Sequence, residues 1–177
     1  MDTLYVIDFE GNKRLGVWEY GIVTLSNFAD IIECKYVPCK GEFSNKSGEF
    51  FAKRKKGLFC SHSMATEDGL LRHYWASPGK VPLFYRPGDT LRWGPWIDTK
   101  MIYRKLFPGL LGYELHQLVD IFGLHELLDV YAARYCPVDA RKFHSALFDA
   151  LAASLLLKHL TKFYTNISLE KLVLLSN

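Results

Sequence analysis

Two acidic side chains near the start of the sequence lie two positions apart, in the segment Asp8-Phe9-Glu10-Gly11. The apolar run at 4–9 is rich in β-forming residues and predicts a strand. Residues two apart in a strand point to the same side, so both carboxylates would project together. Like charges at that separation repel unless a cation offsets them, and hard oxygen ligands suit Mg²⁺ or Mn²⁺. The pair indicates a divalent-metal site, with a solvated strand end as the alternative.

A histidine and an aspartate near the other end form the second candidate group. His144 precedes Asp149 by five positions, where a long stretch rich in Ala and Leu begins. Acids are rarely buried without a partner or a metal, so Asp149 does not fit a merely solvated helix face. Histidine side chains titrate near neutral pH and suit proton transfer. The alternative for His144 is a loop histidine with a satisfied hydrogen bond.

Hydrophobic periodicity predicts the elements that would position these residues. A polar loop at 41–57, with a short helix at 50–56, and a loop at 77–95 rich in Pro and Gly separate them. Thr66 is the expected cap of the first long helix. Strands are predicted at 4–9, 17–25, 31–37, 58–60 and 96–98, and helices at 66–75, 99–107, 113–122, 126–135 and 144–163. This order predicts one α/β domain over 1–177, with a mixed central sheet covered by helices.

The composition is that of an ordinary soluble enzyme, and we expect a cytoplasmic protein. No window of about 18 consecutive apolar residues is present, and the first residues lack a signal-peptide pattern, so no membrane association is expected. The net charge of +3 permits a nucleic-acid partner without arguing for one. The four cysteines include no Cys-x-x-Cys pair and are interpreted as free thiols. A zinc site of Cys34, Cys39, Cys60 and His62 is the alternative.

Taken together, the motif at 8–11 and the motif at 144–150 resemble the first and last motifs of the DEDDh exonucleases. These enzymes are the DnaQ-like, proofreading-subunit group of the ribonuclease H-like superfamily. The resemblance extends over nearly the whole chain, because the segments 97–109 and 113–124 are similar to those that follow the family's middle motif. It implies a ribonuclease H-like α/β fold, with a mixed central sheet flanked by helices.

The middle motif departs from the family pattern. The family has His-Asn, two residues and then Phe-Asp, whereas this chain runs from His62 to Glu67, with Thr66 in place of the aromatic residue. Glu67 occupies the position of the third carboxylate. Asp68 is the second candidate and Asp98 the third. Successive helix positions point about 100° apart, so only one of Glu67 and Asp68 would face the site.

The resemblance implies a metal-dependent 3′-to-5′ exonuclease that hydrolyses terminal phosphodiesters of DNA or RNA and releases nucleoside monophosphates. It implies two Mg²⁺ or Mn²⁺ ions per site. Asp8, Glu10 and Asp149 would hold the first ion, and Glu67 would hold the second. His144 would act as the general base on the attacking water. The partner would be the 3′ end of a single-stranded nucleic acid.

Further residues are candidates for contacts with the substrate. Phe9 and Gly11 flank the implied metal site, and a ring there would stack on the terminal nucleotide while the glycine allows a close backbone approach. The basic run at 53–56 would contact phosphates, unless it is a solvated face. Arg141 and Lys142 lie closer in sequence to the implied general base.

Two other functions remain open at this stage. A catalytically impaired nucleic-acid-binding module on the same fold would account for the altered middle motif. A phosphoesterase acting on small nucleotides could use the same residues. The sequence specifies neither a polymerase or repair partner nor an oligomeric state, although the apolar segment 167–175 could pack on the core or in a homodimer.

Overall fold

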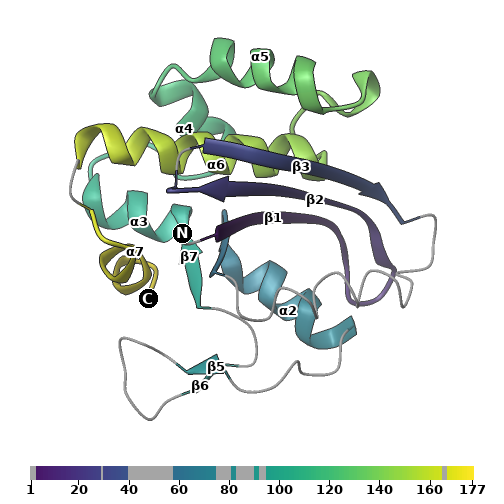
Figure 1. The fold of residues 1–177 in the computed structure, drawn as a ribbon, viewed down its shortest axis with the longest axis horizontal. Helices are drawn as coiled ribbons and strands as arrows, with labels where there is room; N and C mark the ends of the chain where they lie inside the picture. The colour runs from purple at the N-terminus through teal and green to yellow at the C-terminus, as the bar shows by residue number, and fades with distance from the viewer. Residues whose placement is uncertain are drawn as a thin grey trace.

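A five-stranded sheet forms the centre of the protein, as seen in the computed structural model (Figure 1). The structure describes residues 3–28, 30–39, 58–74, 81–82, 90–91, 95–164 and 167–177. The predicted loop and helix within 41–57, including the basic run, lie outside these residues. The strands are β1 (Thr3–Asn12), β2 (Gly16–Ser26), β3 (Asp30–Pro38), β4 (Leu58–Ser61) and β7 (Trp96–Asp98).

The sheet is mixed and has the strand order β3-β2-β1-β4-β7. The first three strands form the predicted antiparallel meander, whereas β4 and β7 run parallel to β1. The parallel pairing of β1 with β4 ends at Val6 and Cys60. Asp8 and Glu10 therefore lie beyond the paired part of β4, at the edge where the parallel strands end. The predicted α/β class and mixed sheet are confirmed.

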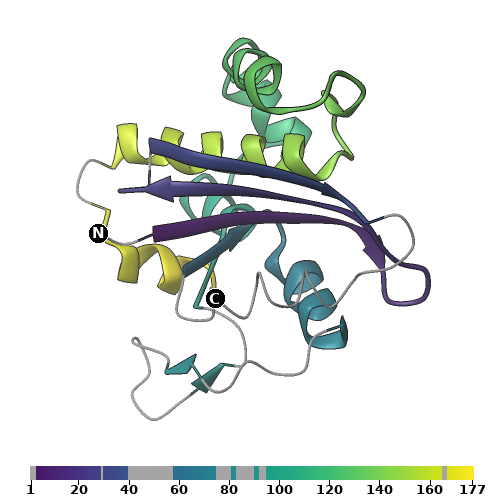
Figure 2. The same cartoon turned by 45° about the vertical axis from the view of Figure 1, so that its right-hand side comes forward.

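Helices cover both faces of the sheet (Figures 1 and 2). Helix α6 lies along one face, with α4 and α5 outside it, and α2 packs on the other side. A separate pair of short strands, β5 (Val81–Pro82) and β6 (Thr90–Leu91), lies where only a loop was predicted. The helices are α2 (Met64–Tyr74), α3 (Thr99–Leu106), α4 (Leu115–Ile121), α5 (His125–Tyr135), the 3₁₀ turn η1 (Val138–Ala140), α6 (Ala146–Phe163) and α7 (Leu169–Leu175).

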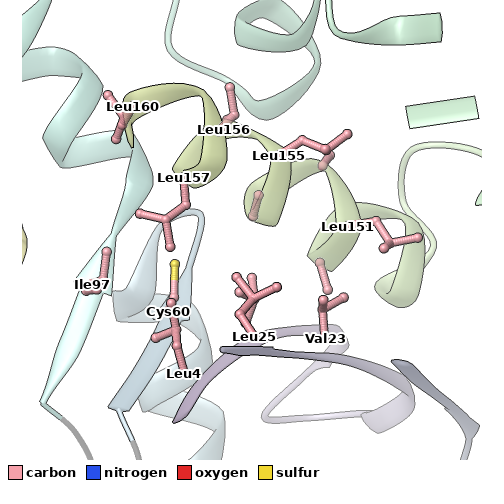
Figure 3. Packing of buried hydrophobic residues seen from close by; sticks show 14 of the residues in the cluster. Leu4, Val23, Leu25, Cys60, Ile97, Leu151, Leu155, Leu156, Leu157 and Leu160 are labelled. Atoms are coloured by element: carbon pink, nitrogen blue, oxygen red, sulfur yellow. The ribbon is translucent and has the colours of Figure 1, made fainter. Parts of the chain in front are cut away.

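Alternation along β1 divides the core into two clusters. Leu4 and Val6 belong to the cluster under α6, where Figure 3 shows Leu157 pointing toward Cys60. Ile7 belongs to the second cluster, which packs against α2. Because side chains two apart share a face, Asp8 and Glu10 continue the face that α6 covers. The predicted same-side projection of the two carboxylates is therefore confirmed.

The start of α2 differs from the prediction. The helix begins at Met64 rather than near Thr66, and Thr66 is not its cap. The backbone N–H groups of Ser63 and Met64 instead donate to the carboxylate of Asp98, at 3.3 and 2.9 Å. The prediction was wrong because this cap comes from β7, which is distant in sequence, whereas a sequence pattern identifies only local caps.

The apolar segment near the carboxyl end forms helix α7, which packs against β7 and α3. The hydroxyl of Ser176 accepts a hydrogen bond from the backbone N–H of Asp98 at 2.8 Å. This contact joins α7 to the strand end from which Asp98 caps α2. Among the described helices, none has both the length and the apolar character that crossing a bilayer requires.

A glycine on β2 lets α6 approach the sheet closely. Gly21 pairs with Asp8 across the β1–β2 ladder. A Cβ atom at Gly21 would overlap the backbone of Ala146 and Leu147, in the first turn of α6. Only glycine leaves room for this contact, which places the start of the helix directly beside Asp8.

Gly21→Ala should therefore destabilise the protein. The added methyl group meets backbone atoms that cannot rotate away, so we expect the free energy of unfolding to fall by about 1–3 kcal/mol. Urea denaturation followed by circular dichroism measures this change. Gly109→Ala is the matched control, because nothing lies within 4 Å of a Cβ built at Gly109. Equal effects of the two substitutions would contradict the close-approach argument.

Candidate active site

Three side chains from distant parts of the sequence converge at the end of β1. Glu10, His144 and Asp149 each offer one potential ligand atom, and these atoms all lie within 4.8 Å of one another. Glu10 is on β1, Asp149 is in the first turn of α6, and His144 lies in the loop before that helix. This is the one group of His, Cys, Asp or Glu within the described residues with that spacing. It matches the convergence that the two sequence motifs predict.

Asp8 shares the electrostatic environment of this group. Burial raises the pKa of its carboxyl group well above the usual value, and the charges of Glu67, Asp149 and Glu10 raise it further. Burial also raises the pKa of Glu10, against the lowering effect of His144. The four predicted carboxylates therefore interact with one another across β1, α2 and α6. Such mutual repulsion is costly unless a proton or a cation offsets it.

Glu67 is the most deeply buried of the predicted site residues. Its side chain is 3% exposed, and its Oε2 atom has no hydrogen-bond partner. Burial raises the pKa of Glu67 to about 8; a hydrogen bond from its own backbone opposes the rise, and the charges of Asp98 and Glu10 add to it. A buried carboxylate oxygen without a donor is rare, because the loss of hydration is then uncompensated.

Asp68, the second candidate for the middle carboxylate, has a different partner. It forms an ion pair with Arg72, one helical turn further along α2. Its charge is not among those that raise the pKa of Asp8, whereas the charge of Glu67 is. The structure therefore brings Glu67, rather than Asp68, to the acidic group.

Asp98, the third candidate, serves as a cap for two helices. Besides accepting the two N–H groups at the start of α2, its Oδ1 atom accepts the backbone N–H of Met101 at 3.1 Å, at the start of α3. Its charge reaches Glu67 and raises the pKa of that residue. With three backbone donors on one carboxylate, Asp98 has an evident structural role and lies behind Glu67.

Asp149 and His144 are linked through the backbone. The His144 N–H donates to Asp149 Oδ2 at 3.1 Å, and Asp149 Oδ1 is buried without a partner. Burial raises the pKa of Asp149 to about 7, and the charges of Glu10 and Glu19 add to the rise against the His144 hydrogen bond. His144 has a φ of 64°, a left-handed conformation that costs energy for a non-glycine residue. This conformation ends the predicted helix over 144–163 two residues early, at Ala146.

These residues fit a divalent cation. Glu67 and Asp149 each have one buried oxygen that nothing in the protein satisfies. Together with Asp8 and Glu10 they form a set of hard oxygen donors of the kind that Mg²⁺ and Mn²⁺ prefer. A cation among them would satisfy the free oxygens and remove the repulsion that raises the carboxyl pKa values.

An open cleft of about 340 Å³ gives access to the site. Asp8, His144 and Asp149 line its floor, so the acidic group is reachable from solvent. Further along, Leu115 and Phe143 contribute apolar surface. The remaining lining residues are His62, Ser63, Glu114 and His116.

The predicted substrate contacts at Phe9 and Gly11 need correction. Phe9 is 5% exposed and packs against Tyr20 in the cluster on the opposite face from Asp8, with ring centroids 6.0 Å apart. Its ring is therefore not available for stacking on a nucleotide, because the residue between two same-side carboxylates points the other way. Gly11 lies at a register shift of β1, where a Cβ would overlap the backbone of Gly16. That overlap accounts for Gly11 without a ligand.

His62 is a structural residue, and the zinc alternative is wrong. Its Nε2 donates to the Tyr113 carbonyl and its Nδ1 pairs with the Thr99 hydroxyl, both at 2.9 Å. Burial lowers the pKa of His62 to about 4, so the ring is neutral at pH 7. Cys34 on β3 and Cys60 on β4 are separated by the two intervening strands of the sheet. Three strand spacings of about 4.8 Å each place these thiols too far apart for one ion.

Arg141 also differs from its predicted role. Its guanidinium donates to the carbonyl oxygens of Cys136 and Ala133, at 3.2 and 3.1 Å. These carbonyls belong to the end of α5, where a cation is favourable. Arg141 therefore stabilises the end of a helix, whereas Lys142 is exposed.

Glu19 is a site residue that the sequence analysis missed. It pairs with Glu10 in the β1–β2 ladder, and its Oε1 accepts the backbone N–H of Ala146 at 2.7 Å. The Tyr36 hydroxyl donates to its Oε2 at 2.6 Å. Only the strand register places Glu19 beside the acidic group, and no local motif marks that register.

Comparisons with known proteins provide no family assignment. The chain matches no model of a known protein family, and no curated protein matches it. The argument for a function therefore depends on the motif residues and on the geometry described above.

The raised pKa of Glu67 predicts how the stability of the metal-free protein depends on pH. The folded state keeps this proton up to about pH 8, whereas the unfolded chain releases it near the model value of 4.5. The associated stability is complete below pH 4.5 and is lost as the pH rises through 8. Glu67→Gln removes the charge, so at pH 8.5 it should stabilise the metal-free protein by on the order of 1–3 kcal/mol.

Urea denaturation in a chelator at pH 5 and pH 8.5 measures this difference. At pH 5 the two proteins should have similar stability, because the wild-type carboxyl group is then protonated. Glu126→Gln is the matched control, since Glu126 is exposed on α5. If Glu67→Gln and Glu126→Gln show the same pH dependence, Glu67 does not carry the buried charge that we assign to it.

Proposed function

We propose that this chain is a metal-dependent 3′-to-5′ exonuclease with a ribonuclease H-like fold, related to the DEDDh exonucleases. The observation that carries the proposal is the convergence of Glu10, His144 and Asp149, whose ligand atoms all lie within 4.8 Å. Asp8 and Glu67 share the same electrostatic environment. The two sequence motifs predict this set of side chains, and the mixed five-stranded sheet flanked by helices is compatible with the proposed fold.

The acidic residues would bind two Mg²⁺ or Mn²⁺ ions. Asp8, Glu10 and Asp149 would hold one ion, and Glu67 would hold the other. When bound, the ions supply Lewis-acid stabilisation of the charge that develops on the scissile phosphate. The free oxygens of Glu67 and Asp149 support this assignment, because each has a lone pair directed at no protein donor.

His144 would accept the proton of the attacking water. It is exposed at the cleft, and its backbone N–H is held by Asp149, so the imidazole stands beside the carboxylates. A new P–O bond forms as the proton passes to His144, and the bond to the 3′ oxygen of the shortened chain breaks. A neutral imidazole near the attacking water suits this general-base role.

The size of the cleft supports the release of one nucleotide at a time. About 340 Å³ is within the range of small-ligand sites. Leu115 and Phe143 would contact the base of the terminal nucleotide, in the place that the sequence analysis gave to Phe9. The products would be nucleoside monophosphates.

One observation favours a second candidate function, a phosphoesterase acting on small nucleotides. The described residues that line the cleft include no lysine or arginine. Proteins that bind long nucleic acids usually place such residues along the phosphate backbone. The same assay can separate the two functions if it includes small phosphodiesters as well as oligonucleotides.

The test uses single-stranded DNA and RNA oligonucleotides labelled at the 5′ end, with Mg²⁺, Mn²⁺ or a chelator. We expect a ladder of products shortened from the 3′ end, release of nucleoside monophosphates and no reaction in the chelator. His144→Ala, purified in the same way, should cleave roughly 10²–10⁴-fold more slowly. Equal activity in that variant would point to a contaminating nuclease. Cleavage of small phosphodiesters alone would establish the second candidate instead.

A matched pair of variants on α2 tests the middle carboxylate. Glu67→Gln keeps the shape of the side chain and removes its charge, so cleavage should slow by about 10²-fold or more. Asp68→Asn should stay within a few-fold of wild type, because Asp68 pairs with Arg72. Initial rates at saturating Mg²⁺ measure both effects. The reverse pattern would show that the site uses Asp68.

A further inference from the structure

Glu19 connects three elements at the edge of the candidate site. It lies on β2, its Oε1 accepts the Ala146 N–H of α6 at 2.7 Å, and its Oε2 accepts the Tyr36 hydroxyl of β3 at 2.6 Å. Hydrogen bonding to Glu19 is the first cause that raises the pKa of Tyr36 to about 12, so the phenol remains the donor at neutral pH. Both oxygens of Glu19 are thus engaged, and the tyrosine fixes the carboxylate in the direction of α6.

The start of α6 depends on this carboxylate. Ser145 is the residue before the helix, and its side chain makes no capping hydrogen bond. Glu19 supplies the missing acceptor from another strand, and its charge is favourable beside the positive end of an 18-residue helix. The contact lies next to the close approach at Gly21, so β2 holds the first turn of α6 through both packing and hydrogen bonding.

The residue held between these contacts is His144. On one side its own N–H is bound to Asp149, and two residues further on the Ala146 N–H is bound to Glu19. Its left-handed backbone, with a φ of 64°, is unfavourable without such contacts, because a free loop would relax to a common conformation. Anchoring on both sides therefore keeps the imidazole at the cleft.

We propose that Glu19, oriented by Tyr36, is a positioning residue that holds the loop of His144 in its active conformation and thereby sets the turnover rate. The role of His144 in turnover rests on the proposed exonuclease function, whereas the backbone anchor does not. Glu19 acts through the peptide backbone rather than by touching the substrate. Its loss should reduce kcat more than it changes KM, because the cleft that binds the substrate is lined by other residues.

The experiment combines hydrogen exchange with kinetics on four variants. Glu19→Ala removes the acceptor, Glu19→Gln keeps an acceptor oxygen for Ala146, and Tyr36→Phe removes the orienting donor. Glu33→Ala is the control, because Glu33 is an exposed glutamate on the neighbouring strand β3. Amide exchange at His144 and Ala146 is measured by NMR in the metal-free protein, and kcat and KM are measured on a single-stranded oligonucleotide with saturating Mg²⁺.

In Glu19→Ala we expect the His144 and Ala146 amides to exchange at least about tenfold faster. We expect kcat to fall by about 10–100-fold while KM stays within about threefold. Glu19→Gln should recover most of the rate, Tyr36→Phe should be intermediate, and Glu33→Ala should match wild type. Recovery by glutamine shows that the acceptor matters, rather than the charge.

Unchanged amide exchange in both Glu19→Ala and Tyr36→Phe would overturn the proposal, whatever the activity. Faster exchange with unchanged kcat would also overturn it, since the anchor would then not control His144. A rate that extra Mg²⁺ restores in Glu19→Ala would replace positioning with a role in metal binding. If wild type has no nuclease activity, the exonuclease function fails, while the exchange data still decide whether Glu19 anchors the loop. Tyr36→Phe leaves Glu19 in place and provides the exchange test if Glu19→Ala does not fold.

Discussion

The close approach of α6 to β2 at Gly21 is the contact on which the rest of the site depends. Because no Cβ separates them, the backbone of the first helical turn lies directly on the strand that pairs with β1. That distance lets Asp149 reach the carboxylates of β1, and it lets Glu19 accept the helix N–H. A larger residue at this position would move the helix outward and separate the two halves of the acidic group. The catalytic geometry is therefore fixed by backbone packing before any side chain of the site interacts.

The same contact imposes an electrostatic cost. Bringing the helix to the sheet buries carboxyl groups beside one another, and their raised pKa values record the repulsion and lost hydration. Residues that packed equally well without charge would give a more stable protein, so the arrangement favours binding at the expense of stability. A divalent cation offsets this cost most directly, because it neutralises charge and satisfies the free oxygens at once. Metal binding and folding are coupled in such a site.

The sequence predicted those features that local rules determine. Alternation placed Asp8 and Glu10 on one side of a strand, and helical periodicity located α6 from its apolar run. Alternation, applied further, would also have directed Phe9 away from the substrate. The role of Glu19 and the capping of α2 by Asp98 could not be predicted, because both require the register of strands that are distant in sequence. The left-handed backbone of His144 likewise depends on contacts from other elements.

The two helices of the site follow the same construction. In α2 and in α6 the acidic residue of the site, Glu67 or Asp149, lies in the first turn and keeps one buried oxygen free. In each case a carboxylate from a strand binds the N–H groups at the start of the helix, Asp98 for α2 and Glu19 for α6. An acid in the first turn normally folds back to satisfy such N–H groups itself. Because the strands supply the caps, Glu67 and Asp149 are released from capping and their free oxygens remain available to the cleft. The helix ends still contribute partial positive charge, which lowers the cost of holding both acids close together.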